Sequence, residues 1–435
     1  MSLYSDLRKT IQYAGRNGLR QTWYAAAERM KSRAGKPYAY EAPLPESLKE
    51  QRRQWLRRTG EGEKLPLISI LVPVFNANPI FLQAMLDSVV SQTYGNWELI
   101  LADGSRGTAE ASEAVKTLGD RRIRYRRLPS NGGISRNTNA AAELARGDYV
   151  AFLDYDDLLT EDAIFEVTHK IERTGAEILY SDEDKVDETG RKFSEVNRKP
   201  DFNPDYFLSN NYICHFLVMK RELFLALRLR PQYDGAQDYD LMLRAPWSGI
   251  VHVPKVLYHW RTHRGSTAGN PGSKSYAYEA GKAALKEYFR SCHIDAEVTD
   301  SRHLGFYNIT YRPDIFAARR EVGVVGGKIL DQNHRIIGGM MDANGEVAFL
   351  GLHEMESGPM HRADTRQTAD AVDVRCMVIR DELRPLYQSV FNEAYDRHVL
   401  RPEDDMKDRS LEFCRQVRQK GYLIVWDPSM TFTVQ

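Results

Sequence analysis

Three aspartates lie within four positions at the end of the stretch YVAFLDYDDLL (149–159). Asp154, Asp156 and Asp157 would repel one another if they were crowded together without a counter-charge. Mg²⁺ and Mn²⁺ prefer carboxylate oxygens combined with water and substrate phosphates, so one bound cation would remove this repulsion and could hold a diphosphate. A plainer interpretation stays open, because Asp157 or Thr160 could cap a helix over 160–173.

The residues that must position this triplet alternate between apolar runs and helical patterns. The predicted strands are 67–75, 97–103, 123–129 and 149–154. The predicted helices begin at Pro79, cover about 108–118 and lie within 131–147. Such alternation predicts a mostly parallel, doubly wound α/β sheet, whose ligands bind beyond the carboxyl ends of the strands. Asp103, Asn131 and Asp154 would all lie at that edge.

Downstream of the triplet the pattern is less regular. A predicted strand at 176–184 ends in a second acidic group, Ser181 to Asp184, which could also be a hairpin turn ahead of Gly190. The remaining predicted elements are a strand running into a helix at 210–224, a helix at 236–247 and a strand at 249–260 that Pro254 breaks.

Composition narrows the class of protein. Among 435 residues, 60 Lys and Arg balance 60 Asp and Glu, so the sequence predicts no nucleic-acid partner. The four cysteines lie far apart and form no CxxC pair, which indicates a reducing cytoplasm and neither a disulfide framework nor a zinc site. No apolar run is long enough to predict a membrane-spanning helix.

Residues 1–64 depart from this neutral balance, because they hold fourteen Lys and Arg against seven Asp and Glu. Leu3, Leu7, Leu19 and Trp23 are interspersed with the basic residues. This pattern predicts an amphipathic helix that could lie on an anionic membrane surface. The alternative is a helix packed on the next domain with its charges facing water.

Six motifs occur together in one order. They are PVFN (73–76), ADGS (102–105), NGGISRN (131–137), LDYDDLL (153–159), GAQDYDLMLR (235–244) and LYHWRTHRGSTA (257–268). Their order and spacing resemble family 2 glycosyltransferases of the GT-A fold, of the type that builds bacterial surface polysaccharides. The resemblance covers about residues 66–290. It implies a Rossmann-like GT-A fold and an active domain.

The resemblance also implies a role for each motif. The donor-binding residues would be Pro73, Phe75, Asp103, Asn131, Gly132, Arg136, Asp154 and Arg261. The metal ligands would be Asp154 and Asp156, with His259 and His263 of the late loop. Asp238 would be the catalytic base, and Asp182, Glu183 and Gln237 would lie on the acceptor side. Ala102 and Gln237 depart from the family, which usually has acidic residues there.

These roles predict a single inverting displacement. Asp238 would accept the proton of the acceptor hydroxyl as it attacks the anomeric carbon, while a divalent cation, Mn²⁺ or Mg²⁺, and Arg261 stabilise the departing nucleoside diphosphate. Plainer interpretations are a helix N-cap for Asp238 and packed side chains beside Trp260 for the histidines. A nucleotidyltransferase is disfavoured, because FNANP after the first strand holds no basic residue for a triphosphate.

Three segments follow from these patterns: a basic helical segment (1–64), a GT-A domain (65–295) and a C-terminal α+β domain (296–435). RCMVIRDEL (375–383) resembles CHFLVMKREL (214–223), and 407–430 resembles 237–257, so the last domain could be a decayed second transferase module. It lacks a second DxD motif, and we expect acceptor binding or assembly into a homodimer rather than transfer. The alternative is that two short sequence patterns have converged.

The leading functional hypothesis is therefore a hexosyl- or deoxyhexosyltransferase. Its partners would be a UDP or dTDP sugar and a growing, lipid-linked cell-surface glycan, and it would act in the cytoplasm as a peripheral protein at the inner face of the cell membrane. The alternative hypothesis is a non-catalytic subunit that binds nucleotide sugar or glycan and assists a partner transferase.

Overall fold

The computed structural model describes residues 3–34, 38–107, 110–263, 275–396 and 406–434. The chain forms two compact units. The larger unit comprises Pro37–Phe202 and Asn211–Tyr288, and the smaller unit comprises Met1–Lys36, Asn203–Asn210 and Phe289–Gln435. The three predicted segments do not coincide one to one with these units, since residues 1–64 are divided between them.

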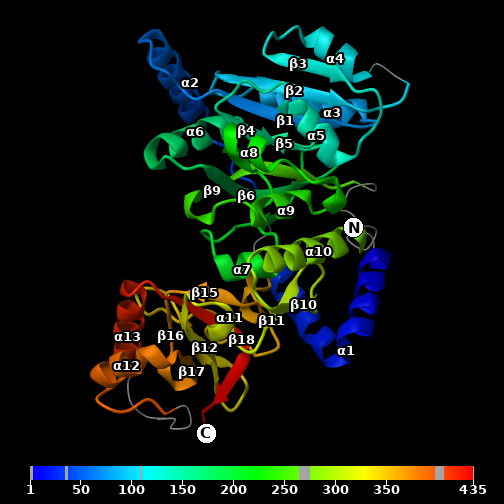
Figure 1. The fold of residues 1–435 in the computed structure, drawn as a ribbon. Coiled ribbons are helices and arrows are strands. Elements are labelled where there is room, and N and C mark those ends of the chain that lie inside the picture. Colours follow the sequence, from blue (N-terminus) through cyan, green and yellow to red (C-terminus); the bar gives the residue numbers. More distant parts are fainter. Residues whose placement is uncertain (1–2, 35–37, 108–109, 264–274, 397–405, 435) are drawn as a thin grey trace. The chain divides into compact units, whose positions relative to one another are not determined.

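The larger unit is built on one mixed sheet. Within the described residues its strand order is β3-β2-β1-β4-β8-β6-β9-β5, with β7 paired to β6 (Figure 1). The strands are β1 (Ile68–Val74), β2 (Trp97–Asp103), β3 (Ile123–Arg127), β4 (Tyr149–Phe152), β5 (Leu158–Leu159), β6 (Ile178–Val186), β7 (Phe193–Asn197), β8 (Val218–Lys220) and β9 (Ile250–Arg261). β1 to β4 pair in parallel.

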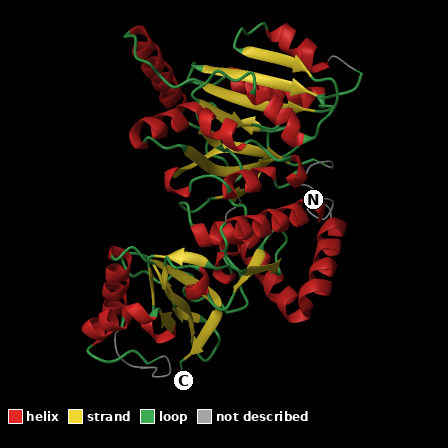
Figure 2. Ribbon diagram, viewed as in Figure 1, coloured by secondary structure: helices red, strands yellow, loops and turns green. Residues whose placement is uncertain are grey.

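Helices flank this sheet (Figure 2). They are α2 (Pro45–Gly60), α3 (Pro79–Val90), α4 (Glu110–Leu118), α5 (Ile134–Ala142), α6 (Ala163–Thr174), α8 (Arg221–Leu227) and α9 (Gln237–Leu243). α10 (Ser275–Ser291) follows β9, and its last three residues belong to the smaller unit. α3 begins where predicted because Pro79 fits a first helical turn and the Asn78 side chain caps the amide of Ile80. The predicted strand–helix series from residue 67 to residue 154 is confirmed.

Apolar side chains on both faces of the central strands explain the depth of this core. Ile70, Leu71 and Val72 of β1 are fully buried, although successive strand side chains point to opposite faces. A continuous apolar run is expected for a strand that is covered on both sides.

One local prediction is confirmed and one is wrong. Ser181 to Asp184 lie inside β6, as the predicted strand at 176–184 requires, and not in the alternative hairpin turn. The turn comes at Gly190, which donates to the carbonyl of Asp187. β9 continues through Pro254 instead of breaking, because its pairing with β6 shifts register near Ser181 and Asp182 and absorbs the missing N–H there.

The smaller unit is α+β. Its helices are α1 (Leu3–Ala34), α7 (Pro204–Ser209), α11 (Ile315–Ala318), α12 (Arg384–Phe391) and α13 (Lys407–Gln419). Its strands are β10 (Ala296–Asp300), β11 (Tyr307–Tyr311), β12 (Val322–Leu330), β13 (Ile336–Gly338), β14 (Met340–Met341), β15 (Gln367–Ala369), β16 (Ala371–Val372), β17 (Met377–Ile379) and β18 (Leu423–Thr433). Phe413, Ile424 and Trp426 are at the centre of its core.

Strand pairing in the smaller unit repeats part of the larger one. β6 has an antiparallel partner β8 and a parallel partner β9, and β12 likewise has β17 and β18. Each central strand is also followed by an antiparallel hairpin strand, β7 and β13 respectively. The sequence similarity between 375–383 and 214–223 and between 407–430 and 237–257 therefore coincides with a repeated strand topology. This supports the proposal that the smaller unit is a second, incomplete module.

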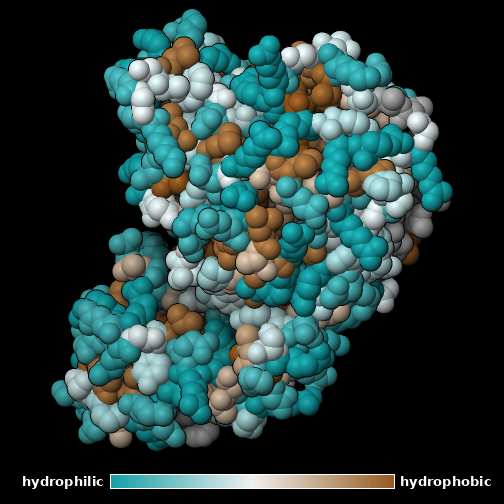
Figure 3. Space-filling model, turned by 45° about the horizontal axis from the view of Figure 1, so that its top comes forward, coloured by the Kyte–Doolittle hydropathy of each residue, from teal (hydrophilic) through white to brown (hydrophobic). Residues whose placement is uncertain are grey.

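α1 contains a break at Gly18, whose φ of 78° is outside the helical range. After this break, one face of the helix packs within the smaller unit through Gln21, Tyr24 and Glu28. None of the described helices is long and apolar enough to cross a membrane. The face of the molecule in Figure 3 is mostly hydrophilic, with apolar surface in separate patches.

Candidate functional site at the carboxyl edge of the sheet

Parallel pairing brings the ends of β1, β2 and β4 to one edge. Val74 lies opposite Asp103, and Leu71 lies opposite Phe152, two residues before Asp154. Pro73, Asp103 and Asp154 therefore lie at the same edge of the sheet. The predicted strand ends also place Asp103 and Asp154 there. Phe75 follows β1 and is 40% exposed.

Asp103 is almost fully buried and is held by three donors. Its Oδ1 accepts the amide of Ser105 at 2.8 Å, and its Oδ2 accepts the Tyr125 hydroxyl at 2.8 Å and an Arg127 guanidinium N–H at 3.3 Å. These contacts fix the carboxylate at the end of β2 and hold the ADGS turn in place.

The glycine turn before α5 is closed by amide side chains. Asn131 Oδ1 accepts the amide of Gly133 and the side chain of Asn137, and Asn137 Oδ1 accepts the amide of Gly132 at 3.1 Å. Gly133 has a φ of +85°, which only glycine adopts without strain. Arg136 is exposed in the first turn of α5.

The three aspartates of the opening motif occupy the short turn between β4 and β5. Asp157 is 1% exposed and accepts the Tyr258 hydroxyl at 2.5 Å and the amide of Arg261 at 2.7 Å. Burial and the neighbouring Asp156 and Asp154 raise the pKa of Asp157 well above its usual value. Asp157 does not cap a helix, since α6 begins only at Ala163.

A cavity of about 70 Å³ opens beside this turn. Its lining joins Pro73 and Asp154 from the sheet edge with His215, Gln237 and Asp238. Asp238 is in the first turn of α9, where Ala236 rather than Asp238 is the N-cap residue. The Asn211 side chain donates to Asp238 Oδ2 at 2.9 Å. The predicted base and the first aspartate of the DxD pair thus border one cavity.

A buried charged cluster that sequence reasoning missed lies next to this cavity. Glu183 accepts Lys199 Nζ at 3.0 Å and contacts His215 Nδ1 at 3.1 Å. Burial opposes the charge of Glu183, but Lys199 and His215 outweigh it and lower its pKa to about 2. Burial also opposes a charged His215, yet its hydrogen bond to Glu183 raises its pKa to about 9. Nothing in the spacing of these residues in the sequence indicates the cluster.

The other predicted acceptor-side residues are also engaged. Asp182 is 2% exposed, and its Oδ1 accepts the amide of Lys199 at 2.8 Å and contacts His252 Nε2 at 2.9 Å. Gln237 Oε1 accepts the amide of Gly235 and its side chain borders the cavity.

Candidate metal ligands lie in several places, one of which is the group of Glu183, Cys214 and His215 in the charged cluster above. Asp154, Asp157 and His215 offer ligand atoms within 4.8 Å of one another. Asp156 Oδ2 lies 2.9 Å from His263 Nε2. His259 is buried between Tyr40 and Phe193, with its Nδ1 2.5 Å from Asp184 Oδ1. The structure thus brings Asp154, Asp156 and His263 to the same turn region and directs His259 to a separate carboxylate.

Arg261 is buried beneath this turn. Its guanidinium donates to the carbonyls of Asp156 and Glu188 and lies over the Phe81 ring at 4.8 Å. One guanidinium nitrogen, Nη2, is buried without a hydrogen-bond partner among the described residues. Burial lowers the pKa of this side chain from its usual value. The predicted late loop beyond His263 lies outside the described residues.

Comparison with known proteins identifies the family. Residues 69–228 match the family described as glycosyl transferase family 2. A relative from Escherichia coli K12, the putative colanic acid biosynthesis glycosyl transferase WcaA, is 30% identical over 207 residues, which cover 44% of this chain and 72% of the relative. The chain belongs to glycosyl transferase family 2. This family 2 chain has the GT-A fold, confirming the predicted fold class.

Two longer relatives match about half of this family 2 chain. The O-antigen biosynthesis protein RfbC of Myxococcus xanthus is 37% identical over 54% of this chain, and the uncharacterized protein y4gI of Sinorhizobium fredii is 41% identical over 54%. The chain spans only 19% and 26% of those two proteins. A solved structure of Staphylococcus aureus TarS with UDP gives a TM-score of 0.41 at 18% identity, covering 51% of this chain and 65% of TarS.

The side-chain atoms at the turn that could ligate a metal fit the divalent cation that we expect. Carboxylate oxygens of Asp154 and Asp156 suit Mn²⁺ or Mg²⁺, and His263 adds an imidazole nitrogen of the kind that Mn²⁺ accepts more readily than Mg²⁺. Burial raises the pKa of Asp157 most, and the charges of Asp156 and Asp154 add to it, so a cation bound at this turn would favour the ionised carboxylates.

Proposed function

We propose that this chain is a metal-dependent, inverting glycosyltransferase that moves a sugar from a nucleotide-diphosphate sugar to a growing cell-surface glycan. The observation that carries the proposal is the shared cavity. Asp154 and Asp238 are 84 positions apart in the sequence, yet both line the cavity at the carboxyl edge of the sheet. In doubly wound folds this edge is where ligands bind.

Each side chain has a defined part in the reaction. Asp238 accepts the proton of the attacking acceptor hydroxyl, and Asn211 holds its carboxylate in one orientation. Pro73, Phe75 and Asp103 border the base and ribose of the donor. Asn131, Gly132 and Arg136 border the ribose and diphosphate, where backbone N–H groups of the glycine turn can approach anionic oxygens.

Asp154 and Asp156 hold the cation, and His263 is a further ligand. His259 is not assigned to the cation, because its Nδ1 contacts Asp184 instead. The cation supplies positive charge that neutralises the leaving diphosphate. Arg261 fixes the Asp156 carbonyl, and we assign its remaining Nη2 to the diphosphate. Asp182 and Glu183 support the acceptor side indirectly: their contacts with His252, Lys199 and His215 fix the strand beneath it.

The class of substrate is inferred from relatives. RfbC is named for O-antigen biosynthesis, WcaA for colanic acid and AmsB of Erwinia amylovora for amylovoran. We propose a UDP or dTDP hexose or deoxyhexose as donor and a lipid-linked glycan as acceptor. Such an acceptor places the enzyme at the inner face of the cell membrane.

α1 provides a surface for this membrane contact. Leu19, Trp23 and Met30 are 83%, 65% and 71% exposed. By helical spacing they lie on the face opposite Gln21, Tyr24 and Glu28, which pack within the smaller unit. Exposed apolar side chains near basic residues are typical of helices that lie on anionic lipid.

Nucleoside diphosphate release tests the proposal. UDP and dTDP sugars are incubated with the full chain and a lipid-linked glycan extract, with and without Mn²⁺. We expect release from at least one donor that depends on both Mn²⁺ and acceptor. Thermal stabilisation by a nucleotide sugar without any release would favour the non-catalytic binding subunit instead. If no nucleotide sugar gives either stabilisation or release, both hypotheses are refuted.

A further inference from the structure

The smaller unit contains a polar cavity of about 430 Å³ that the proposed transfer reaction does not use. It lies between the β10–β11 hairpin, β12, residues 354–366 and the bend of β18 at residues 427–429. Hydroxyl and amide side chains are frequent in its wall, including Ser301, Asn308, Thr310 and Thr365. Its volume is in the range of small-molecule sites, and such a wall suits a ligand rich in hydroxyl groups.

Lys328 is the unusual member of the wall. It is part of β12, a strand buried along its whole length, and is only 3% exposed. Among the described residues its three ammonium donors have one hydrogen-bond acceptor, the Glu354 carbonyl at 3.2 Å, and no carboxylate within ion-pair distance. A buried ammonium in this state costs free energy unless a ligand supplies the missing acceptors.

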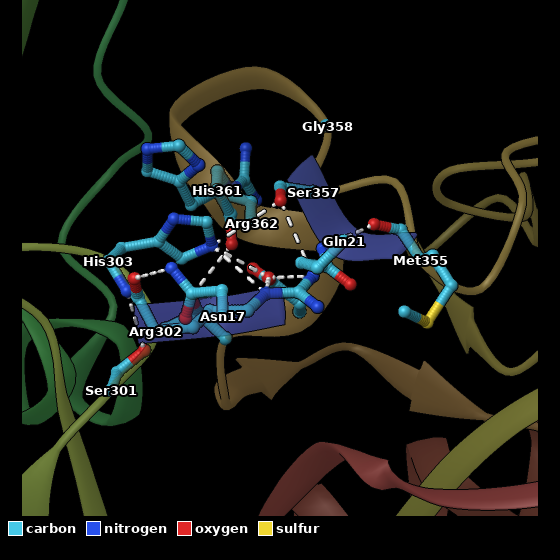
Figure 4. Close-up of polar contacts among 12 residues, drawn as sticks. Asn17, Gln21, Ser301, Arg302, His303, Met355, Ser357, Gly358, His361 and Arg362 are labelled. Carbon is cyan, nitrogen blue, oxygen red and sulfur yellow. Dashed lines mark hydrogen bonds and ion pairs between the residues drawn. The ribbon is translucent and has the colours of Figure 1, made fainter. Parts of the chain in front are cut away.

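The other cations in the wall are already paired. Arg302 pairs with Asp364, and Arg366 pairs with Asp427. Figure 4 shows Arg302 beside His303, Ser357 and Asn17 of α1, whose side chain donates to the Arg302 carbonyl at 3.3 Å. Asp364 Oδ2 also contacts His303 Nε2 at 2.8 Å. Lys328 is therefore the cation in this wall whose charge remains available.

Asp364 offers the complementary atom. Its Oδ2 is used by Arg302 and His303, but its Oδ1 is buried without a hydrogen-bond partner among the described residues. A buried carboxylate oxygen of this kind accepts a hydroxyl proton well. The wall thus presents an ammonium for an anion and a carboxylate oxygen for a hydroxyl.

We propose that this cavity binds an acidic sugar, a saccharide unit that carries one carboxylate. The sugar carboxylate pairs with Lys328, a ring hydroxyl donates to Asp364 Oδ1, and the remaining hydroxyls contact the wall side chains. This assignment goes beyond the transfer site, because binding here requires neither donor nucleotide nor metal.

The repeated topology matches Lys328 to a buried carboxylate of the larger unit. Leu179 of β6 pairs with Val218 and Val251, and Val325 of β12 pairs with Val378 and Val425. Three residues beyond these matched positions are Asp182 and Lys328. Asp182 is a buried carboxylate and Lys328 a buried ammonium, so the two strands carry opposite charges at this matched position.

Burial provides a second sign that the ammonium lacks a partner. Burial lowers the pKa of Lys328 to about 8. The carboxylate of Asp364 acts to raise this pKa, but the charge of Arg302 acts to lower it, so the effect of burial is only partly offset. A bound carboxylate would favour the charged form.

Ligand-observed saturation-transfer NMR on the full chain at pH 7 tests the proposal. The probes are methyl glucuronide and methyl galacturonide, with methyl glucoside as the neutral match and inorganic phosphate as the anion without a sugar. Lys328→Met removes the ammonium, and Lys420→Met at an exposed position is the matched control. Asn308→Ala alters the wall at an exposed residue, so it does not depend on the core.

At least one uronide should bind, with the glucoside at least 10-fold weaker. Lys328→Met should weaken uronide binding at least 10-fold, Asn308→Ala should weaken it measurably, and Lys420→Met should leave it unchanged. Absence of binding by both uronides, or equal binding by wild type and Lys328→Met, would overturn the proposal. Binding of phosphate without either uronide would also overturn it, since the cavity would then be an anion site and not a saccharide site.

Discussion

Asn211 donates a hydrogen bond from its side-chain amide to Asp238 Oδ2 at 2.9 Å. The other atom of the same amide, Asn211 Oδ1, is buried without a hydrogen-bond partner among the described residues. The Asn211 side chain thus orients the proposed base and also offers an amide oxygen that could accept a further hydrogen bond next to it. This is the arrangement expected if the acceptor hydroxyl is held between the two residues.

Replacing Asn211 by Ala should therefore slow transfer by about 10- to 100-fold through kcat, because the base loses its fixed orientation. KM for the donor should change less than about 3-fold, since Asn211 is not among the proposed donor-binding residues. Steady-state kinetics of nucleoside diphosphate release measure both constants. Asn333→Ala, at an exposed site, is the control. A change confined to the donor KM would contradict the positioning role.

Chelation should abolish transfer, and Mn²⁺ should restore it, because Asp154 and Asp156 are the proposed cation ligands. Asp156→Asn should raise the Mn²⁺ concentration for half-maximal activity at least about 10-fold, the usual cost of losing one ligand or its support. Glu188→Gln, an exposed acidic residue of the neighbouring hairpin, provides the control. An unchanged Mn²⁺ dependence in Asp156→Asn would remove Asp156 from the metal site.

Stability should depend on pH through Lys328. Its pKa is about 8 in the folded chain and 10.5 when exposed, so between these values the unfolded chain binds a proton that the folded chain does not. The contribution of Lys328 to the free energy of unfolding therefore rises with pH across this window. Asp364, Arg302 and Glu354 are the charged groups that face Lys328.

Lys328→Met removes this cost, so its advantage over wild type should be greatest below pH 8, roughly 3 kcal/mol before lost packing, and should shrink towards pH 10.5. Urea denaturation at pH 7, 8.5 and 10 measures it, with Lys420→Met as control. A difference that stays constant across this range would show that Lys328 does not titrate as a buried group.

Membrane contact should depend on the exposed face of α1. Leu19→Glu combined with Trp23→Glu should abolish co-sedimentation with vesicles of anionic phospholipid, while binding to neutral vesicles is weak for all variants. Both side chains are exposed, so the substitutions should leave the unfolding temperature unchanged. Wild-type co-sedimentation by the double variant would exclude this face as the lipid contact.

Sequence patterns predicted the elements whose signal is local. β1 and β2 were recognised because covered parallel strands are continuous apolar runs, and Asp103 and Asp154 followed as the residues at strand ends. The starts of α3 and α5 followed from Pro79 and the glycine turn. These signals need only neighbouring residues.

Contacts between distant segments could not be predicted in this way. The charge cluster of Glu183, Lys199 and His215 depends on β6 lying against residues 199 and 215, and no spacing in the sequence indicates it. The role of Asp157 was likewise hidden, because its partners Tyr258 and Arg261 are about a hundred positions away. Lys328 carried no signal, since one lysine in an apolar strand is usually at its edge.

The central claim is that Asp238 acts as the base of a sugar transfer, and the rate of nucleoside diphosphate release tests it most directly. With saturating donor, acceptor and Mn²⁺, we predict that Asp238→Asn is at least about 100-fold slower than wild type. Asp381→Asn, an exposed aspartate of the smaller unit, should match wild type. Equal turnover by Asp238→Asn and wild type would contradict the account.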